Sequence, residues 1–254
     1  MILTTDIGNT HTRFTVFAGE KTSDRLVLST VSRTPDETAM LLSAGLGKYP
    51  IDGAAACSVV PPVTAGVISA VRRVFSCDVI LLGRGVKTGL DIRTDYQSEL
   101  GADIVAAAVG ARRRFSPPFL VFDLGTATTA SFVDEKDVLT GVSIMPGVGI
   151  SAEALSLKCA GLCATDPLSE PDPPLLGRNT PDALSGGILH GHAAMIDGIT
   201  ERISEAVGQN VKTVLCGGYA ERISRLCRRE HSVCPDLTAE GLKRIREMNR
   251  PVIR

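Results

Sequence analysis

The chain has 254 residues, of which 44% are hydrophobic and 22% are charged, and its formal net charge is −1. This length allows one large domain or two of ordinary size, and the composition is that of a globular protein. The near-zero charge gives no electrostatic reason to expect nucleic acid or an anionic membrane as a partner. The sequence contains no apolar run of about 20 residues, so no transmembrane helix is predicted.

The cysteines and the N-terminus both bear on where the protein works. The seven cysteines are odd in number and lack the spacing of a disulfide framework, which is typical of reduced thiols. The first residues form a strand-like run without the basic and apolar regions of a signal peptide. A cytoplasmic location is therefore expected.

The segment Asp6–Arg13 lies between two strand-like runs. The pair Gly8-Asn9 predicts a hairpin, because these residues tolerate the positive φ angles of a tight turn. The Asp6 carboxylate then ends the first strand, and the turn's backbone N–H groups can bind an anion. We expect Asp6 to orient a hydrated Mg²⁺ that bridges phosphates, and Arg13 to donate charge-assisted hydrogen bonds to them.

The elements that follow alternate between strands and helices. They are expected at residues 25–31 (strand), 34–45 (helix, with a Thr34, Pro35, Glu37 capping signal), 53–60 (strand), 63–75 (helix), 79–82 (strand) and 99–114 (helix). A three-stranded meander followed by this alternation predicts a mixed sheet with helices on its faces, an α/β fold. Asp103 lies in the first turn of the helix expected at 99–114, where it either compensates the helix dipole or acts as a general base near a phosphate.

A second copy of the hairpin pattern begins after Ser116-Pro117-Pro118. Residues 119–133 repeat the order of apolar strand, Asp-x-Gly-Thr, hydroxyl-rich turn and second strand, with Asp123 at the strand end. Either copy alone also fits an ordinary hairpin, but two copies predict two related domains that face one another, 1–116 and 117–254. The second half continues with a strand at 137–145, a helix at 150–159, a Pro-rich loop at 166–174, a helix at 181–207, a strand at 211–216 and helices to the end.

Six segments resemble, in the same order, motifs of the type III pantothenate kinases, a family of the acetate and sugar kinase/actin superfamily. The segments are Asp6-Ile7-Gly8-Asn9-Thr10, Ser58-Val59-Val60-Pro61, Leu100-Gly101-Ala102-Asp103, Asp123-Leu124-Gly125-Thr126-Ala127-Thr128-Thr129, Ile144-Met145-Pro146-Gly147, and Asn179-Thr180 with Ala183, Ser185 and Gly186. The resemblance implies two actin-like (ribonuclease H-like) domains with ATP in the cleft between them. It also implies a homodimer whose interface helps to build the pantothenate pocket, and ATP-dependent phosphorylation of pantothenate to 4′-phosphopantothenate, the first step of coenzyme A synthesis.

The resemblance also assigns residues to roles. It implies that Asp103 is the catalytic base, and that Asp123 lies near a monovalent cation, K⁺ or NH₄⁺. The ATP phosphates and Mg²⁺ are expected to contact residues of both hairpins, namely Asp6, Gly8, Asn9, Thr10, His11, Thr12, Arg13, Gly125 and Thr126. The pantothenate site is expected to be lined by Tyr96, Gly101, Ala102, Ile104 and Thr180.

Two positions depart from the family pattern. Ile104 replaces the arginine that contacts the substrate carboxylate, and such a charge-assisted hydrogen bond contributes on the order of 1.5–3 kcal/mol. Cys216 stands before Gly217-Gly218, where the family usually has threonine. Two alternatives to a pantothenate kinase therefore stay open: a regulatory or catalytically impaired paralogue, and a kinase for another small hydroxylated substrate.

Overall fold

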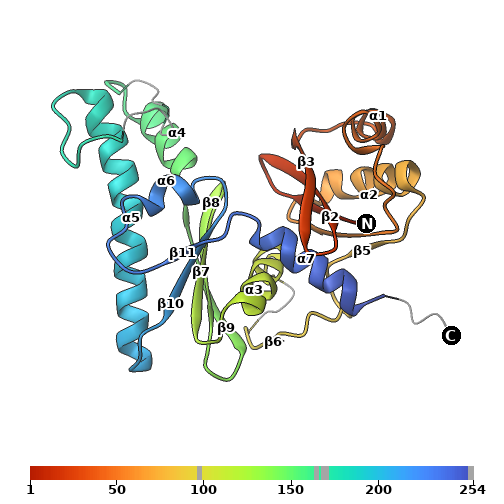
Figure 1. Cartoon of the computed structure of the whole chain (residues 1–254). Helices are drawn as coiled ribbons and strands as arrows, with labels where there is room; N and C mark the ends of the chain where they lie inside the picture. Colours follow the sequence, from red (N-terminus) through yellow and green to blue (C-terminus); the bar gives the residue numbers. More distant parts are fainter. Residues whose placement is uncertain (96–98, 163–165, 167–171, 251–254) are drawn as a thin grey trace. The chain divides into compact units, whose positions relative to one another are not determined.

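The computed structural model describes residues 1–95, 99–162, 166 and 172–250. Its strands are β1 (Ile2–Ile7), β2 (His11–Ala18), β3 (Lys21–Ser29), β4 (Gly53–Ser58), β5 (Val79–Leu81), β6 (Asp91–Ile92), β7 (Phe119–Leu124), β8 (Ala127–Val133), β9 (Val138–Pro146), β10 (Lys212–Cys216) and β11 (Ser232–Val233). Its helices are α1 (Pro35–Leu46), α2 (Pro61–Phe75), α3 (Ala102–Arg114), α4 (Val148–Lys158), α5 (Thr180–Val207), α6 (Ala220–Ser224) and α7 (Leu237–Met248) (Figure 1). Within these ranges, every helix is too short or too polar to cross a membrane.

The chain folds into two compact units. The first contains Met1–Arg114 together with α7, and the second contains Phe115–Asp236. Helix α7, which the predicted domain 117–254 includes, therefore packs with the N-terminal elements after the second unit is complete.

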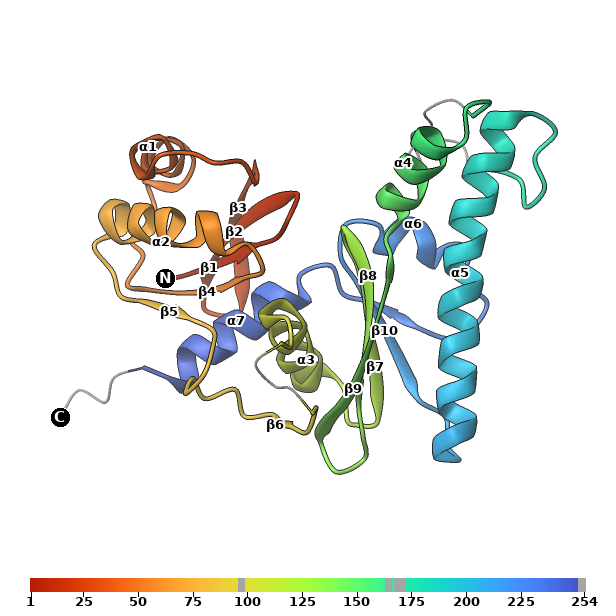
Figure 2. The same cartoon turned by 180° about the vertical axis from the view of Figure 1, so that it is seen from behind.

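The first unit is built on a mixed five-stranded sheet of order β3-β2-β1-β4-β5. β1 pairs antiparallel with β2 and parallel with β4, so the meander and the strand–helix alternation meet at β1. Helices α1 and α2 pack together on one face, and both views show α3 and α7 side by side (Figures 1 and 2). The predicted capping box begins α1: Thr34 Oγ1 accepts from the Glu37 N–H at 3.2 Å, and the Thr34 N–H donates to Glu37 Oε2 at 2.8 Å.

Alternation along β1 decides which face each side chain occupies. Leu3 and Ile7 belong to the apolar core that contains residues of α1 and α2. Asp6 therefore points to the opposite face, where α3 and α7 pack against β4 and α7 also packs against β1. This arrangement brings the end of β1 and the start of α3 to the same side of the sheet.

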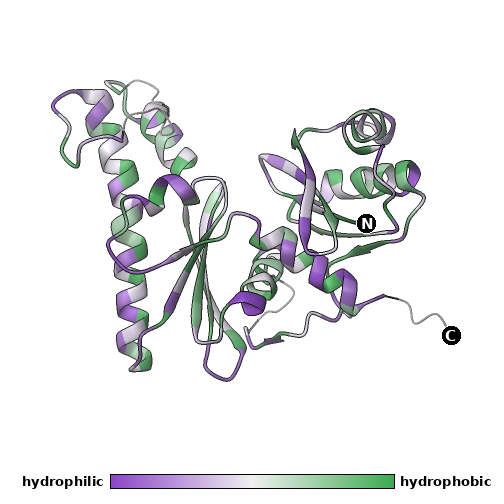
Figure 3. Ribbon diagram, viewed as in Figure 1, coloured by the Kyte–Doolittle hydropathy of each residue, from purple (hydrophilic) through white to green (hydrophobic). Residues whose placement is uncertain are grey.

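The second unit repeats this architecture. Its strands run in the order β11-β10-β7-β8-β9, with β7 antiparallel to β8 and parallel to β10. Residues of α5 such as Leu189 and Ile196 pack against Leu120 and Phe122 of β7. Figure 3 shows hydrophobic strands in both sheets and alternating hydrophobic and hydrophilic turns along the second half of α5. The α/β class and the two mixed sheets flanked by helices confirm the predicted fold.

The conformation of the first turn differs from the expectation. The Gly8-Asn9 pair was expected to adopt positive φ angles, yet neither residue does, while Gly19 at the β2–β3 turn has a φ of 59°. The turn instead closes through the Gly8 N–H, which donates to the His11 carbonyl at 3.1 Å. A Cβ at Gly8 would lie 3.2 Å from that carbonyl oxygen. Glycine is therefore favoured here by the close approach of the His11 carbonyl and not by a positive φ angle.

Candidate functional site

Asp6 is surrounded by side chains from both neighbouring strands. Its Cα partners are Arg13 on β2 and Cys57 on β4. Arg13 Nη1 lies 3.6 Å from Asp6 Oδ2, and the Cys57 thiol donates to Asp6 Oδ1 at 3.5 Å. The strand pairing therefore places a cation and a weak donor beside one carboxylate.

Burial raises the pKa of Asp6 above its ordinary value. The positive charge of Arg13 acts in the opposite direction, while the negative charge of Asp103 raises the pKa further. The two carboxylates are thus close enough to repel each other, although Asp6 ends a strand and Asp103 begins a helix.

Asp103 lies in the first turn of α3 and is half-buried. Burial raises the pKa of this carboxyl group, and hydrogen bonds from the backbone N–H groups of Ile104 and of Asp103 itself lower it in part. The Ile104 N–H donates to Asp103 Oδ1 at 2.9 Å. A Cβ at Gly101 would overlap with Asp103 Oδ1, so glycine at that position leaves the space that the carboxylate occupies.

These carboxylates fit a divalent cation that is completed by a substrate. No group of three His, Cys, Asp or Glu side chains that could hold a metal occurs among the described residues, which gives no evidence for a complete protein cage. Mg²⁺ usually binds through one or two carboxylates and keeps waters or phosphate oxygens as its other ligands. A cation near Asp6 and Asp103 would also relieve the repulsion between them.

The rest of the first hairpin divides into exposed and buried residues. Asn9 and Thr10 are exposed at the turn, Gly8 and His11 are half-buried. Thr12 is buried, and its hydroxyl shares a 2.9 Å hydrogen bond with the hydroxyl of Thr30. The hydroxyl of Thr12 is therefore paired with a residue that directly follows β3.

The residues expected at the pantothenate site lie in different parts of the chain. Gly101 and Ala102 are half-buried at the start of α3, next to Asp103. Ile104 is only 7% exposed, so its aliphatic side chain belongs to the buried surface of α3. Tyr96 lies outside the described residues, and so does most of the predicted Pro-rich loop.

The second unit presents a similar arrangement around Asp123. Its Cα partners are Thr129 on β8 and Cys216 on β10, so threonine occupies the position equivalent to Arg13. Gly217 has a φ of 88°, and a Cβ there would overlap with Asp123 Oδ1. The backbone after β10 is therefore in direct contact with the Asp123 carboxylate.

The Gly125–Thr126 turn is held from a second side by Gly147. The Gly125 N–H donates to the Ala127 carbonyl at 3.1 Å, and a Cβ at Gly147 would overlap with the Thr126 carbonyl oxygen. Pro146-Gly147 and Gly217-Gly218 are both recognisable as motif segments in the sequence. Their close contacts with the second hairpin are visible only in the structure.

A pocket of about 520 Å³ opens at the N-terminus of α5. Its lining combines apolar side chains with polar ones: Leu162, Gly177, Arg178, Asn179, Thr180, Ala183 and Leu184. Asn179 caps the helix by accepting the Asp182 N–H at 2.9 Å. Arg178 is exposed, and within the described ranges no carboxylate pairs with it. The pocket volume is in the range of small-molecule sites.

Comparisons with a family model and with individual proteins identify the same family. The sequence model of the family described as type III pantothenate kinase matches residues 2–202. The type III pantothenate kinase of Brevibacillus brevis is 35% identical over 256 residues, which cover 98% of this chain and all of the relative. That of Streptomyces coelicolor is 36% identical over 265 residues, which cover 98% of each chain.

A solved structure supports the fold independently. A putative 2-dehydro-3-deoxygalactonokinase from Sinorhizobium meliloti superposes with a TM-score of 0.59 at 13% identity, covering 99% of this chain and 100% of that one. At this identity the likeness shows the shared fold alone.

Proposed function

Because the chain belongs to the type III pantothenate kinase family, we propose that it transfers the terminal phosphoryl group of ATP to the primary hydroxyl of pantothenate. The product is 4′-phosphopantothenate, so the reaction is the first step of coenzyme A synthesis. The observation that carries the proposal is geometric: the end of β1, with Asp6 3.6 Å from Arg13, and the start of α3, with Asp103, lie on the same side of the first sheet.

Asp103 is the general base in this proposal. It accepts the proton of the substrate hydroxyl as the oxygen attacks the terminal phosphorus. A raised pKa suits this task, because a base is most effective when its pKa lies nearer to the operating pH. Gly101 and the Ile104 N–H hold the carboxylate in place.

The phosphates of ATP occupy the two hairpin turns. In the first, the backbone of Gly8, Asn9 and Thr10 faces the phosphates, with His11 and Arg13 beside them. In the second, Gly125 and Thr126 contact the nucleotide. Asp6 holds Mg²⁺, which neutralises charge on the phosphates, and Asp123 lies near a monovalent cation, K⁺ or NH₄⁺.

The acidic end of pantothenate requires a cation. The buried side chain of Ile104 offers none, whereas Arg178 is exposed in the pocket that Thr180 lines. We assign Arg178 to the substrate carboxylate, because an arginine binds a carboxylate through two parallel hydrogen bonds. Gly101, Ala102 and Tyr96 are further residues proposed for the substrate site, and the proposed enzyme is a cytoplasmic homodimer whose interface helps to build that site.

Turnover with and without pantothenate tests this function. ATP-to-ADP conversion is measured with Mg²⁺ in K⁺, NH₄⁺ or Na⁺, for the wild type and for Asp103→Asn. We expect pantothenate-dependent turnover that requires K⁺ or NH₄⁺, and its loss in Asp103→Asn with ATP binding retained. Equal activity of the variant would contradict the role of Asp103.

Two other functions are consistent with Ile104 in place of the family's arginine. A regulatory paralogue would bind ATP without turning over pantothenate, and Ile104→Arg would not restore turnover. A kinase for another hydroxylated substrate would prefer uncharged alcohols to pantothenate in a substrate panel. Either result would replace the proposed reaction.

A further inference from the structure

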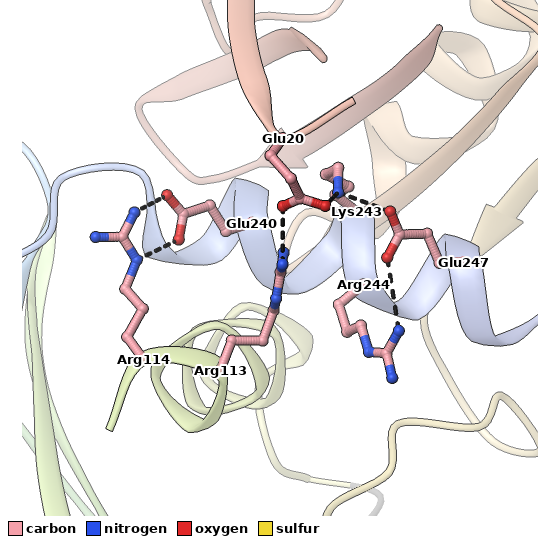
Figure 4. Close-up of polar contacts among 7 residues, drawn as sticks. All are labelled: Glu20, Arg113, Arg114, Glu240, Lys243, Arg244 and Glu247. Atoms are coloured by element: carbon pink, nitrogen blue, oxygen red, sulfur yellow. Dashed lines mark hydrogen bonds and ion pairs between the residues drawn. The ribbon is translucent and has the colours of Figure 1, made fainter. Parts of the chain in front are cut away.

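Six charged side chains join three distant parts of the first unit around α7 (Figure 4). We name them the α7 clamp: Glu20, Arg113, Arg114, Glu240, Lys243 and Glu247. Glu20 is in the turn between β2 and β3, Arg113 and Arg114 are in the last turn of α3, and the remaining three are on α7. Arg244, also drawn, contacts the clamp only at its edge, 3.7 Å from Glu247.

Lys243 is the buried centre of the clamp. Its side chain is 2% exposed, and its Nζ donates to Glu20 Oε1 at 2.8 Å and to Glu247 Oε1 at 2.6 Å. A buried ammonium group is costly unless its partners are well placed, and an apolar side chain would often serve stability as well. A buried lysine is thus better explained by a need for one particular arrangement than by stability.

Glu20 links Lys243 to α3. Hydrogen bonds from Lys243 and then from Arg113 lower the pKa of Glu20 to about 2. Arg113 Nη2 lies 2.8 Å from Glu20 Oε2. The neighbouring Arg114 donates to Glu240 through both Nε and Nη2. This bidentate geometry fixes the orientation of the two side chains relative to each other. The end of α3 is therefore bound to α7 and to the hairpin turn.

Backbone contacts continue this attachment along α3 towards its N-terminus. A Cβ at Gly110 would overlap with the Leu237 carbonyl oxygen, and a Cβ at Gly241 would overlap with that of Ala106. Helices in such close contact cannot slide or rotate without collision. The Gly241–Ala106 contact lies within one turn of Asp103.

The same helix supports the strands that carry the other site residues. α7 packs against β1, in which Asp6 is the last residue but one, and against β4, which ends in Ser58. Arg246 pairs with Asp78 at 2.9 Å, and a Cβ at Gly53, the first residue of β4, would lie 2.5 Å from Arg246 Nε. α7 thus contacts both elements whose carboxylates must be kept at a fixed separation.

We propose that α7 is the positioning element of the kinase site, and that Lys243, through the clamp, fixes Asp103 relative to Asp6. Lys243 touches neither carboxylate, so it is a positioning residue. The inference rests on the proposed function, in which Asp103 is the base and Asp6 holds the metal. The matched family segment ends at residue 202, well before α7.

The test compares Lys243→Met with Arg244→Met. Both substitutions remove one positive charge and one contact with Glu247 from neighbouring positions of α7, but Arg244 is exposed, and in the described part of the chain no ion pair joins it to α3 or the hairpin. We expect kcat to fall about 10- to 100-fold in Lys243→Met, since a displacement near 1 Å can cost about that much. We expect the Kd for ATP to change less than about twofold, and Arg244→Met to resemble the wild type.

A second measurement does not need activity. Crystal structures of the wild type, Lys243→Met and Arg244→Met report the distance between the Asp6 and Asp103 carboxylates directly. If the clamp fixes this separation, the distance should change in Lys243→Met and stay constant in Arg244→Met. If Lys243→Met does not fold, Glu20→Gln carries both measurements, because Glu20 is 67% exposed.

The outcomes separate the two proposals. A folded Lys243→Met or Glu20→Gln protein with wild-type kcat and an unchanged distance between the Asp6 and Asp103 carboxylates overturns the positioning role and leaves the proposed function intact. A wild type without pantothenate-dependent turnover contradicts the proposed function, while the crystal structures still decide whether the clamp sets the carboxylate separation.

Discussion

The Cys57 thiol donates a hydrogen bond to the Asp6 carboxylate, with 3.5 Å between Sγ and Oδ1. The two residues are Cα partners on the parallel strands β4 and β1, and Cys216 and Asp123 hold the same register on β10 and β7. Each unit therefore places a buried cysteine next to the aspartate at the end of its first strand. The internal repeat extends from strand order to the neighbours of individual site residues.

Removal of the Cys57 thiol is expected to move the pH dependence of turnover. The hydrogen bond from Cys57 lowers the pKa of Asp6, so Cys57→Ala should raise this pKa and shift the acidic limb of the kcat/KM profile to higher pH. Cys57→Ser retains a hydroxyl donor and should keep the limb near its wild-type position. Identical profiles for the two variants would show that the thiol does not act on Asp6.

Asp103→Asn is expected to stabilise the protein while it removes turnover. Because burial raises the pKa of Asp103, the native state holds its proton more tightly than the unfolded state does. The associated stability is present below the ordinary pKa of 3.8 and is lost as the pH rises through the native value.

The gain in Asp103→Asn should therefore be complete at neutral pH, and each kcal/mol of it would raise Tm by about 2–4 °C in a chain of this size. It should vanish in acid below the ordinary pKa. Thermal unfolding at several pH values measures this gain. A constant difference between variant and wild type across the pH range would contradict a raised pKa of Asp103 in the native state.

Local signals predicted most of the fold. The Thr34 capping box, the strand alternation around each Asp-x-Gly pair and the repeat in the second half all depend on short stretches, and these elements appear within a few residues of the expected bounds. The return of α7 to the first unit depends on contacts between residues far apart, such as Gly241 with Ala106, for which the sequence contains no local pattern.

The candidate site was predictable in composition but not in its contacts. Asp6 and Asp103 were identified separately, each from a local motif, and their mutual repulsion follows only from the faces that β1 and α3 present. Cys57 was overlooked because it precedes the Ser-Val-Val-Pro segment. Its place opposite Asp6 depends on the β1–β4 register, which a single sequence does not reveal.

Gly101→Ala is expected to reduce kcat by displacing the base. The added Cβ would overlap with Asp103 Oδ1, so the carboxylate must move away from its present position. We expect a fall in kcat of about 100-fold, with ATP affinity nearly unchanged. Gly187→Ala on α5 is the control, because nothing lies within 4 Å of its Cβ position; kinetic assays of both variants distinguish displacement from a general effect of alanine.

Gly217→Ala is expected to weaken the binding of K⁺ or NH₄⁺. At a φ of 88° an L side chain is strained by about 1–3 kcal/mol, and its Cβ would push against Asp123 Oδ1. Turnover as a function of K⁺ concentration should show a higher half-saturating value than in the wild type. Gly208→Ala, also at positive φ but with open space around it, reproduces the backbone strain without touching Asp123. An equal effect in both variants would contradict the cation site.

Arg178→Gln is expected to impair binding of pantothenate but not of its uncharged alcohol analogue. Loss of a charge-assisted hydrogen bond of about 1.5–3 kcal/mol corresponds to a KM for pantothenate that is roughly 10- to 100-fold higher. The alcohol analogue carries no carboxylate, so its KM should stay near the wild-type value. Steady-state kinetics with both substrates measures the difference.

Arg202→Gln provides the control, because Arg202 is an exposed arginine on α5 and lies outside the lining of the pocket. A parallel rise in KM for both substrates in Arg178→Gln would indicate damage to the pocket and not the loss of carboxylate recognition. If the KM for pantothenate is unchanged, the carboxylate is recognised elsewhere. Because the side chain of Ile104 is buried and uncharged, a cation other than Arg178 would then bind the substrate carboxylate.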